Sequence, residues 1–186
     1  ANGARVINAS YGGGAFDEVE RDAIFAASTN GVLFVAAAGN ESTENDLIPA
    51  FPASYDVENI ISVAALDRKD KLAWFSNFGR TTVHLGAPGT EIFSSWNGSD
   101  SDYNTIEGTS MASPHVAGVA ALILGANPGA SMVEMRERIL RTTVPVEDLA
   151  NRTLTGGRVN AYRALMAKSD TLMEMLFSPR TNSAVL

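Results

Sequence analysis

Ser110 is the residue best placed to do chemistry. It lies in the run Gly108-Thr109-Ser110-Met111-Ala112-Ser113-Pro114-His115-Val116-Ala117-Gly118, at the start of a long apolar stretch. A serine at the start of a buried helix exposes its hydroxyl where free backbone N–H groups can stabilise negative charge on a reacting carbonyl oxygen. Pro114 fits the first turn of such a helix, where its missing N–H costs nothing. The run predicts a serine nucleophile, and a serine that only caps a core helix is the alternative.

Two further segments carry groups that such a nucleophile needs. Asn40 follows the apolar run 32–38 and Gly39, and its side-chain amide could hold the oxyanion of a tetrahedral intermediate beside the Ser110 N–H. A simple turn residue is the alternative for Asn40. The run Ser10-Tyr11-Gly12-Gly13 would let an extended peptide add to an exposed backbone edge, because glycines allow close approach. A flexible loop is the alternative there.

The base that would activate the serine is not evident in the sequence. A serine nucleophile needs a base within hydrogen-bond reach and a carboxylate that orients it. The chain has two histidines. His115 follows Ser110 by five residues on the same helix, about 7.5 Å along the axis and some 140° around it, so it cannot be the base. His84 lies on a predicted strand, and we interpret both histidines as structural.

Two other serine-hydrolase orders fail on the sequence. A chymotrypsin-like order of His84, Asp100 or Asp102, then Ser110 is formally present, but that fold consists of antiparallel barrels and cannot contain the buried helices expected here. In α/β-hydrolase esterases the serine of the nucleophile elbow is followed along the chain by an Asp or Glu and then by a histidine. No histidine follows His115 in this sequence.

The elements that must position these residues alternate along the chain. Residues 32–38 form a continuous apolar run, as expected for a parallel strand that is covered on both faces. A Ser-x-x-Glu pattern at residues 131–134 predicts a capped helix start. We expect strands over residues 6–11, 32–38, 60–66, 83–87 and 91–95, a polar loop over 97–104, and helices over 16–30, 110–125, 131–142 and 160–176. The alternation predicts a three-layer α/β/α fold with a mostly parallel sheet.

Composition and charge exclude several partners. The chain has 186 residues, 45% of them hydrophobic, with 14 basic and 21 acidic groups and a net charge of −7. No basic cluster could displace counterions from phosphates, so we expect no nucleic-acid partner. The longest apolar run, residues 116–126, is well short of the roughly 18 residues that span a bilayer, so we expect no membrane partner.

The motifs together resemble the subtilisin-like serine proteases (subtilases, peptidase S8). Their nucleophile pattern is Gly-Thr-Ser-Met-Ala-x-Pro-His-Val-x-Gly, which the run at Ser110 matches. The segment ending at Asn40 resembles the one that carries the oxyanion asparagine, and residues 7–13 resemble the substrate-binding strand, with Tyr11 where the family usually has Leu. Further matches are Phe51-Pro52-Ala53, Phe75-Ser76-Asn77-Phe78-Gly79, Ala87-Pro88-Gly89 and Gly157-Arg158-Val159-Asn160-Ala161.

The resemblance implies a serine endopeptidase that forms an acyl-enzyme at Ser110, with Asn40 in the oxyanion hole. The implied substrate-binding residues are Ser10, Tyr11, Gly12, Gly13, Ala38, Gly39, Ala50 and Thr109. Ala50 falls at the base of the pocket for the side chain before the scissile bond, which predicts a roomy, uncharged pocket. The family often has a cis peptide at the position of Phe51-Pro52.

The resemblance also implies what is missing. The triad order Asp, His, Ser puts the Asp and His upstream of Ala1, so residues 1–167 are expected to be the C-terminal portion of a catalytic domain. The sheet would then be incomplete on its N-terminal side and the isolated chain inactive. Residues 168–186 are expected to be a helix end and tail. The alternative is a non-catalytic subtilase-like module that binds peptides or another domain.

Partners and cofactors follow from the same resemblance. It implies a peptide or protein substrate, the missing N-terminal half, a propeptide, and a secreted or extracytoplasmic location. No cofactor is needed for the chemistry. The resemblance also implies a structural calcium, with backbone carbonyls near Ala53, Tyr55 and Ile60 as candidate ligands. The loop Asp100-Ser101-Asp102 is another oxygen-rich site. Met111, beside the nucleophile, predicts sensitivity to oxidation.

Overall fold

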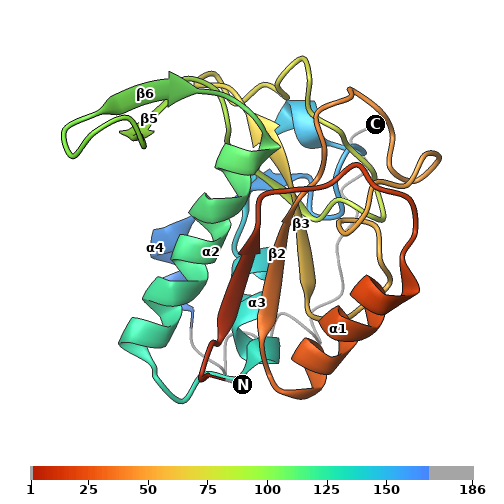
Figure 1. Cartoon of the computed structure of the whole chain (residues 1–186), viewed down its shortest axis with the longest axis vertical. Coiled ribbons are helices and arrows are strands. Elements are labelled where there is room, and N and C mark those ends of the chain that lie inside the picture. The colour runs from red at the N-terminus through yellow and green to blue at the C-terminus, as the bar shows by residue number, and fades with distance from the viewer. Residues whose placement is uncertain (1, 168–186) are drawn as a thin grey trace, which may run out of the picture.

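The computed structural model describes residues 2–167, which form a parallel sheet between two layers of helices (Figure 1). The strand order of the main sheet is β1-β2-β3-β4-β8-β7. The strands are β1 (Val6–Ala9), β2 (Leu33–Ala37), β3 (Ile60–Leu66), β4 (Leu85–Pro88), β7 (Val144–Pro145) and β8 (Gly157–Arg158). All neighbours pair in parallel except β7 and β8, which are antiparallel. β1 therefore lies at one edge of the sheet.

The helices divide between the two faces of the sheet. They are α1 (Glu18–Thr29), α2 (Thr109–Ala126), α3 (Met132–Arg141) and α4 (Ala161–Met166), with a short 3₁₀ helix, η1 (Glu147–Leu149). Leu33 and Val35 of β2 pack in one core with α2, α3 and α4, whereas Phe34 and Ala36 pack in a second core with Ile24 of α1. Alternate residues of one strand thus face opposite helix layers, which confirms the predicted α/β/α architecture.

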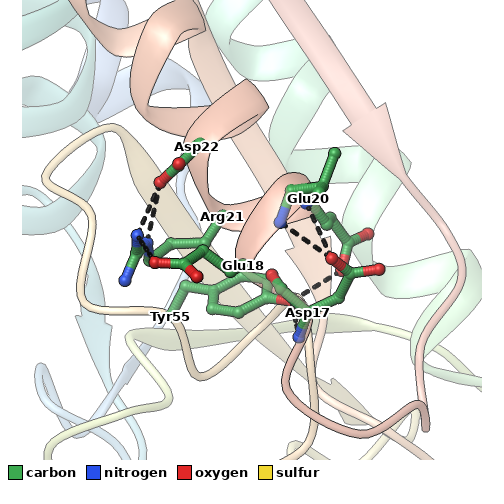
Figure 2. Close-up of polar contacts among 7 residues, drawn as sticks. Asp17, Glu18, Glu20, Arg21, Asp22 and Tyr55 are labelled. Carbon is green, nitrogen blue, oxygen red and sulfur yellow. Dashed lines mark hydrogen bonds and ion pairs between the residues drawn. The ribbon is translucent and has the colours of Figure 1, made fainter.

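Local sequence signals set the helix starts. Asp17 caps α1, because its Oδ1 accepts from the N–H groups of Val19 (2.8 Å) and Glu20 (3.3 Å) (Figure 2). Ser131 caps α3 by accepting from the Glu134 N–H at 3.1 Å, as the sequence predicts. α2 is long and apolar enough to cross a membrane by length and composition, but it packs over β1 to β4 as the central helix of the core.

The structure differs from the predicted elements at the C-terminal side. Residues 92–95 and 103–106 form an antiparallel hairpin, β5 (Ile92–Ser95) and β6 (Tyr103–Ile106), which projects beyond the start of α2 (Figure 1). The sequence predicts a loop to residue 104, because β6 is polar and exposed. β7 and β8 are also unpredicted, since two-residue strands have no periodicity. α4 ends at Met166 rather than at residue 176, because Ala167 is extended. The predicted tail, 168–186, lies outside the described residues.

Candidate active site

Ser110 is fixed at the junction of α2 and β1. Its Oγ donates to the backbone oxygen of Ser10 at 3.1 Å, and the Ser10 Oγ donates to the backbone oxygen of Ser110 at 2.7 Å. Gly108, before the helix, gives no side-chain cap. Among the described residues the Ser110 N–H has no hydrogen-bond partner. The start of α2 therefore presents a hydroxyl and an unused donor at the carboxyl end of β1.

Asn40 is oriented by the same helix start. Its Oδ1 accepts two hydrogen bonds of 2.9 Å, from the backbone N–H and the Oγ1 of Thr109. The amide Nδ2 is left without a partner within residues 2–167, and a Cβ on Gly108 would lie 3.7 Å from it. Because the oxygen is anchored, the nitrogen faces the first turn of α2. Asn40 Nδ2 and the Ser110 N–H are thus two free donors at one helix end.

Gly39 is required by the turn that delivers Asn40. Its φ is +114°, and a Cβ there would lie 2.3 Å from Asn77 Nδ2. The Gly39 N–H donates to Thr109 Oγ1 at 3.2 Å, so this hydroxyl links the end of β2 to α2. No residue with a side chain would fit at this position without moving the loop.

Asn77 organises the loop after Asn40, a role that the sequence did not reveal. It is fully buried, and its Oδ1 accepts from the N–H groups of Glu41 (2.9 Å) and Thr43 (3.1 Å). Its Nδ2 donates to Glu41 Oε2 at 2.9 Å and to Asn45 Oδ1 at 3.1 Å. The motif Phe75-Ser76-Asn77-Phe78-Gly79 matches the family pattern, but its spacing does not indicate which loop Asn77 stabilises.

The cavity beside Ser110 has a carboxylate in its lining. Its volume is about 40 Å³, and it is lined by Tyr11, Gly12, Ala37, Gly39, Asn40, Glu41, Thr109 and Ser110. Ala38 instead packs against Ala64 and Val83, and Ala50 is buried beyond the lining. The Glu41 carboxylate turns back because the Asn40 N–H and Asn77 Nδ2 both donate to it at 2.9 Å. The sequence did not predict this carboxylate, and the roomy, uncharged pocket based on Ala50 stays a prediction.

The predicted substrate-binding segment runs along the loop that begins at Phe51. The Gly13 N–H donates to the Phe51 oxygen at 3.1 Å, and a Cβ on Gly12 would lie 3.1 Å from that oxygen. The Phe51-Pro52 peptide is cis, as the resemblance implied. Tyr11 is 56% exposed, and its hydroxyl donates to Glu20 Oε1 at 3.1 Å. Burial and this carboxylate raise the pKa of Tyr11.

Glu20 connects Tyr11 to a second tyrosine at the start of α1. The Tyr55 hydroxyl lies 2.9 Å from Glu20 Oε2 and 3.0 Å from the Asp17 backbone oxygen, and it accepts from the Asp17 N–H (Figure 2). These contacts fix the loop that holds Phe51 and the wall that Tyr11 forms.

Neither histidine approaches Ser110 within the described part of the chain. His115 is exposed, and its Nδ1 lies 2.8 Å from the Met111 oxygen on its own helix. His84 Nδ1 accepts a hydrogen bond of 3.0 Å from the Ser62 N–H, and its Nε2 lies 3.0 Å from an Arg136 nitrogen. Burial, and then the Arg136 charge, lower the pKa of His84 to about 3, so it is neutral. Neither ring is a hydrogen-bond partner of the Ser110 hydroxyl, which donates to the Ser10 oxygen.

Two of the groups considered as calcium ligands already have hydrogen-bond partners within the chain. The Ile60 oxygen lies 3.4 Å from Arg136 Nε, which donates to it. Asp102 Oδ2 accepts from the Gly98 N–H at 3.0 Å inside the β5–β6 turn. No group of three or more His, Cys, Asp or Glu that could hold a metal occurs in residues 2–167. These hydrogen bonds would compete with a metal ion, and a structural calcium stays a prediction.

The sequence model of the Subtilase family (peptidase S8) matches residues 1–165. The chain belongs to the Subtilase family. It is 41% identical over 164 residues to the Thermophilic serine proteinase of Bacillus sp. (strain AK1), covering 88% of this chain and 38% of that protein. It is 38% identical over 148 residues to Subtilisin DY of Bacillus licheniformis, covering 79% of this chain and 52% of that protein.

A solved structure of a protease from Pseudoalteromonas arctica superposes with a TM-score of 0.76 at 33% identity, over 89% of this chain and 51% of that one. This subtilase therefore has the subtilisin-like α/β fold, and its family is one of serine proteases. The chain spans from 13% of Subtilisin-like protease 2 of Plasmodium falciparum to 52% of Subtilisin DY.

Proposed function

We propose that Ser110 is the nucleophile of a serine endopeptidase and that Asn40 Nδ2 and the Ser110 N–H form its oxyanion hole. The observation that carries the proposal is the pair of unused donors next to the half-buried Ser110 hydroxyl at one helix end. Preorganised donors of this kind stabilise the negative oxygen of a tetrahedral intermediate.

The reaction has two halves. The Ser110 oxygen attacks the carbonyl carbon of the peptide, the carbonyl oxygen becomes negative, and the serine proton passes to a base. The C–N bond then breaks, the amine leaves with a proton, and water hydrolyses the resulting acyl-enzyme. The base and its carboxylate partner come, in this proposal, from a part of the catalytic domain outside residues 2–167. The isolated chain would bind peptide but would not turn it over appreciably.

The missing part of the domain would dock on β1 and α2. β1 has no neighbour on its outer side among the described strands, so its backbone groups are free to pair with another strand. Beside it, α2 exposes Pro114, His115, Gly118 and Leu122. Both surfaces adjoin Ser110, so a segment that covers them would bring its own side chains to the hydroxyl.

Substrate, location and processing follow the relatives. We propose a peptide or protein substrate, a secreted or extracytoplasmic site of action, and a propeptide in the longer protein. The chain is 39% identical over 176 residues to the Extracellular basic protease of Dichelobacter nodosus, which supports the location.

The second candidate is a peptide-binding module without activity. It is favoured by the position of both histidines away from Ser110 in residues 2–167. A fluorophosphonate probe separates the two, because an activated serine displaces fluoride and becomes phosphonylated. In the longer protein that contains this chain we expect a label on Ser110 that Ser110→Ala removes. A folded longer protein that binds peptide but leaves Ser110 unlabelled would establish the binding module instead.

A further inference from the structure

A second pocket, of about 310 Å³, lies at the amino ends of β3 and β4, whereas Ser110 lies at the carboxyl end of β1. Its lining includes Ala53, Tyr55, Asp56, Glu58, His84 and Arg136. Ala53 and Tyr55 are two of the three residues whose backbone oxygens were candidate cation ligands, and the third, Ile60, begins β3. If a positive charge holds the loop of residues 53–60, it should therefore lie in this pocket.

Arg136 of α3 already brings a cation to the pocket. Its side chain is 23% exposed, and Nε donates to the Ile60 oxygen at 3.4 Å. Burial lowers the Arg136 pKa, while the nearby carboxylates of Glu137 and Glu58 act against this. A guanidinium remains charged in such surroundings. The carboxylates around the pocket therefore already have a counter-charge.

His84 lies beside the guanidinium as a neutral ring. The Ser62 N–H donates to Nδ1, so the neutral ring carries its proton on Nε2, 3.0 Å from an Arg136 nitrogen. Protonation of Nδ1 would remove the acceptor of the Ser62 N–H, and burial and the Arg136 charge also keep His84 neutral. A metal ion could reach Nε2 only by displacing Arg136.

We infer that Arg136 takes the place of a structural cation: its guanidinium, not a metal ion, is the positive charge that holds the 53–60 loop against β3 and α3. A divalent ion within about 4 Å of the guanidinium would be repelled strongly enough to lower its affinity by ~1000-fold or more. Tyr55 needs no metal to fix its position, because its hydroxyl is bound at the start of α1 (Figure 2).

Thermal unfolding of the 186-residue chain tests this inference without any catalytic readout. We expect the wild-type midpoint to be the same in excess EDTA and in millimolar calcium. If a calcium site existed, free calcium at 100 times its dissociation constant would raise the midpoint by roughly 5–10 °C. Arg136→Met should lower the midpoint by about 5 °C more than the matched Arg141→Met, and Arg136→Lys should recover at least half of the loss. Arg141 is the control because it lies on the same helix and pairs with Glu137.

Two results would overturn the inference. One is Arg136→Lys being as unstable as Arg136→Met, since shape rather than charge would then hold the loop. The other concerns the wild-type chain alone and stands even if the variants fail to fold. Terbium bound beside Tyr55 would give saturable emission excited through that ring, which calcium would compete away and Tyr55→Phe would abolish. We expect no such emission.

Discussion

Replacing Thr109 by valine should loosen the start of α2 and the position of Asn40 together. Thr109 is fully buried, and its hydroxyl donates to Asn40 Oδ1 at 2.9 Å while accepting from the Gly39 N–H at 3.2 Å. Valine has nearly the same shape but neither of these bonds. The variant therefore removes both hydrogen bonds of the Thr109 hydroxyl, with little change in packing.

The structure gives the size of the effect. Two hydrogen bonds contribute roughly 1–3 kcal/mol together, and an unsatisfied Gly39 N–H adds to the loss, so the free energy of unfolding should fall by about 2–4 kcal/mol. For a chain of this length that lowers the thermal midpoint by about 5–10 °C. Thr109→Ser keeps the hydroxyl and loses one methyl group, which costs only about 1 kcal/mol.

Thermal unfolding of the 186-residue chain, followed by circular dichroism, measures both variants against wild type. Hydrogen exchange at the Gly39 amide adds a local readout, because that N–H loses its acceptor in Thr109→Val and keeps it in Thr109→Ser. If the valine variant unfolds at or above the midpoint of the serine variant, the hydroxyl does not join β2 to α2 and the argument is wrong.

Three other predictions use different groups. Asn40→Asp keeps the acceptor for Thr109 but loses the Nδ2 donor, so kcat of the longer protein should fall by about 10²–10³ with little change in KM, a size known from subtilisin itself; an unchanged kcat would exclude the oxyanion role. His84 stays neutral when folded, so the unfolded chain takes up a proton first as the pH falls from 6.5 towards its folded pKa of about 3. Urea titrations should show a loss of about 2 kcal/mol between pH 7 and pH 5 that His84→Asn largely lacks; equal losses would contradict the assignment. Peroxide should lower the activity of the longer protein, and Met111→Leu should protect it, whereas equal sensitivity would place the oxidised residue elsewhere.

The sequence predicts the elements that are long and buried. β2 and β3 appear as continuous apolar runs because both faces of each strand are covered, and α2 begins where Ser110 and Pro114 predict. β6, β7 and β8 were not predictable in the same way, since short or polar strands depend on their partners rather than on their own pattern. The end of α4 at Met166 was also not predictable, because neither glycine nor proline follows it at residue 167.

The site was predictable where a local motif specifies geometry. Ser110, Asn40 and Thr109 meet as the runs at 36–40 and 108–110 indicate. The pocket was not, because its wall depends on the direction of the chain after Gly39, whose φ of +114° turns Glu41 back onto Asn77. Periodicity reports which face of a strand is buried, but it does not report where a side chain points after a turn of this kind.

The proposed chemistry needs two sets of groups, and the described residues hold one of them in place. The oxyanion donors depend on bonds among Gly39, Asn40 and Thr109, which all lie within this chain and join the end of β2 to the start of α2. Proton transfer needs a base that the described residues do not bring to Ser110. In the proposed function, a partner segment on β1 and α2 would therefore add the base to donors that this chain already holds in place. Nucleophilic reactivity at Ser110 would therefore require that segment.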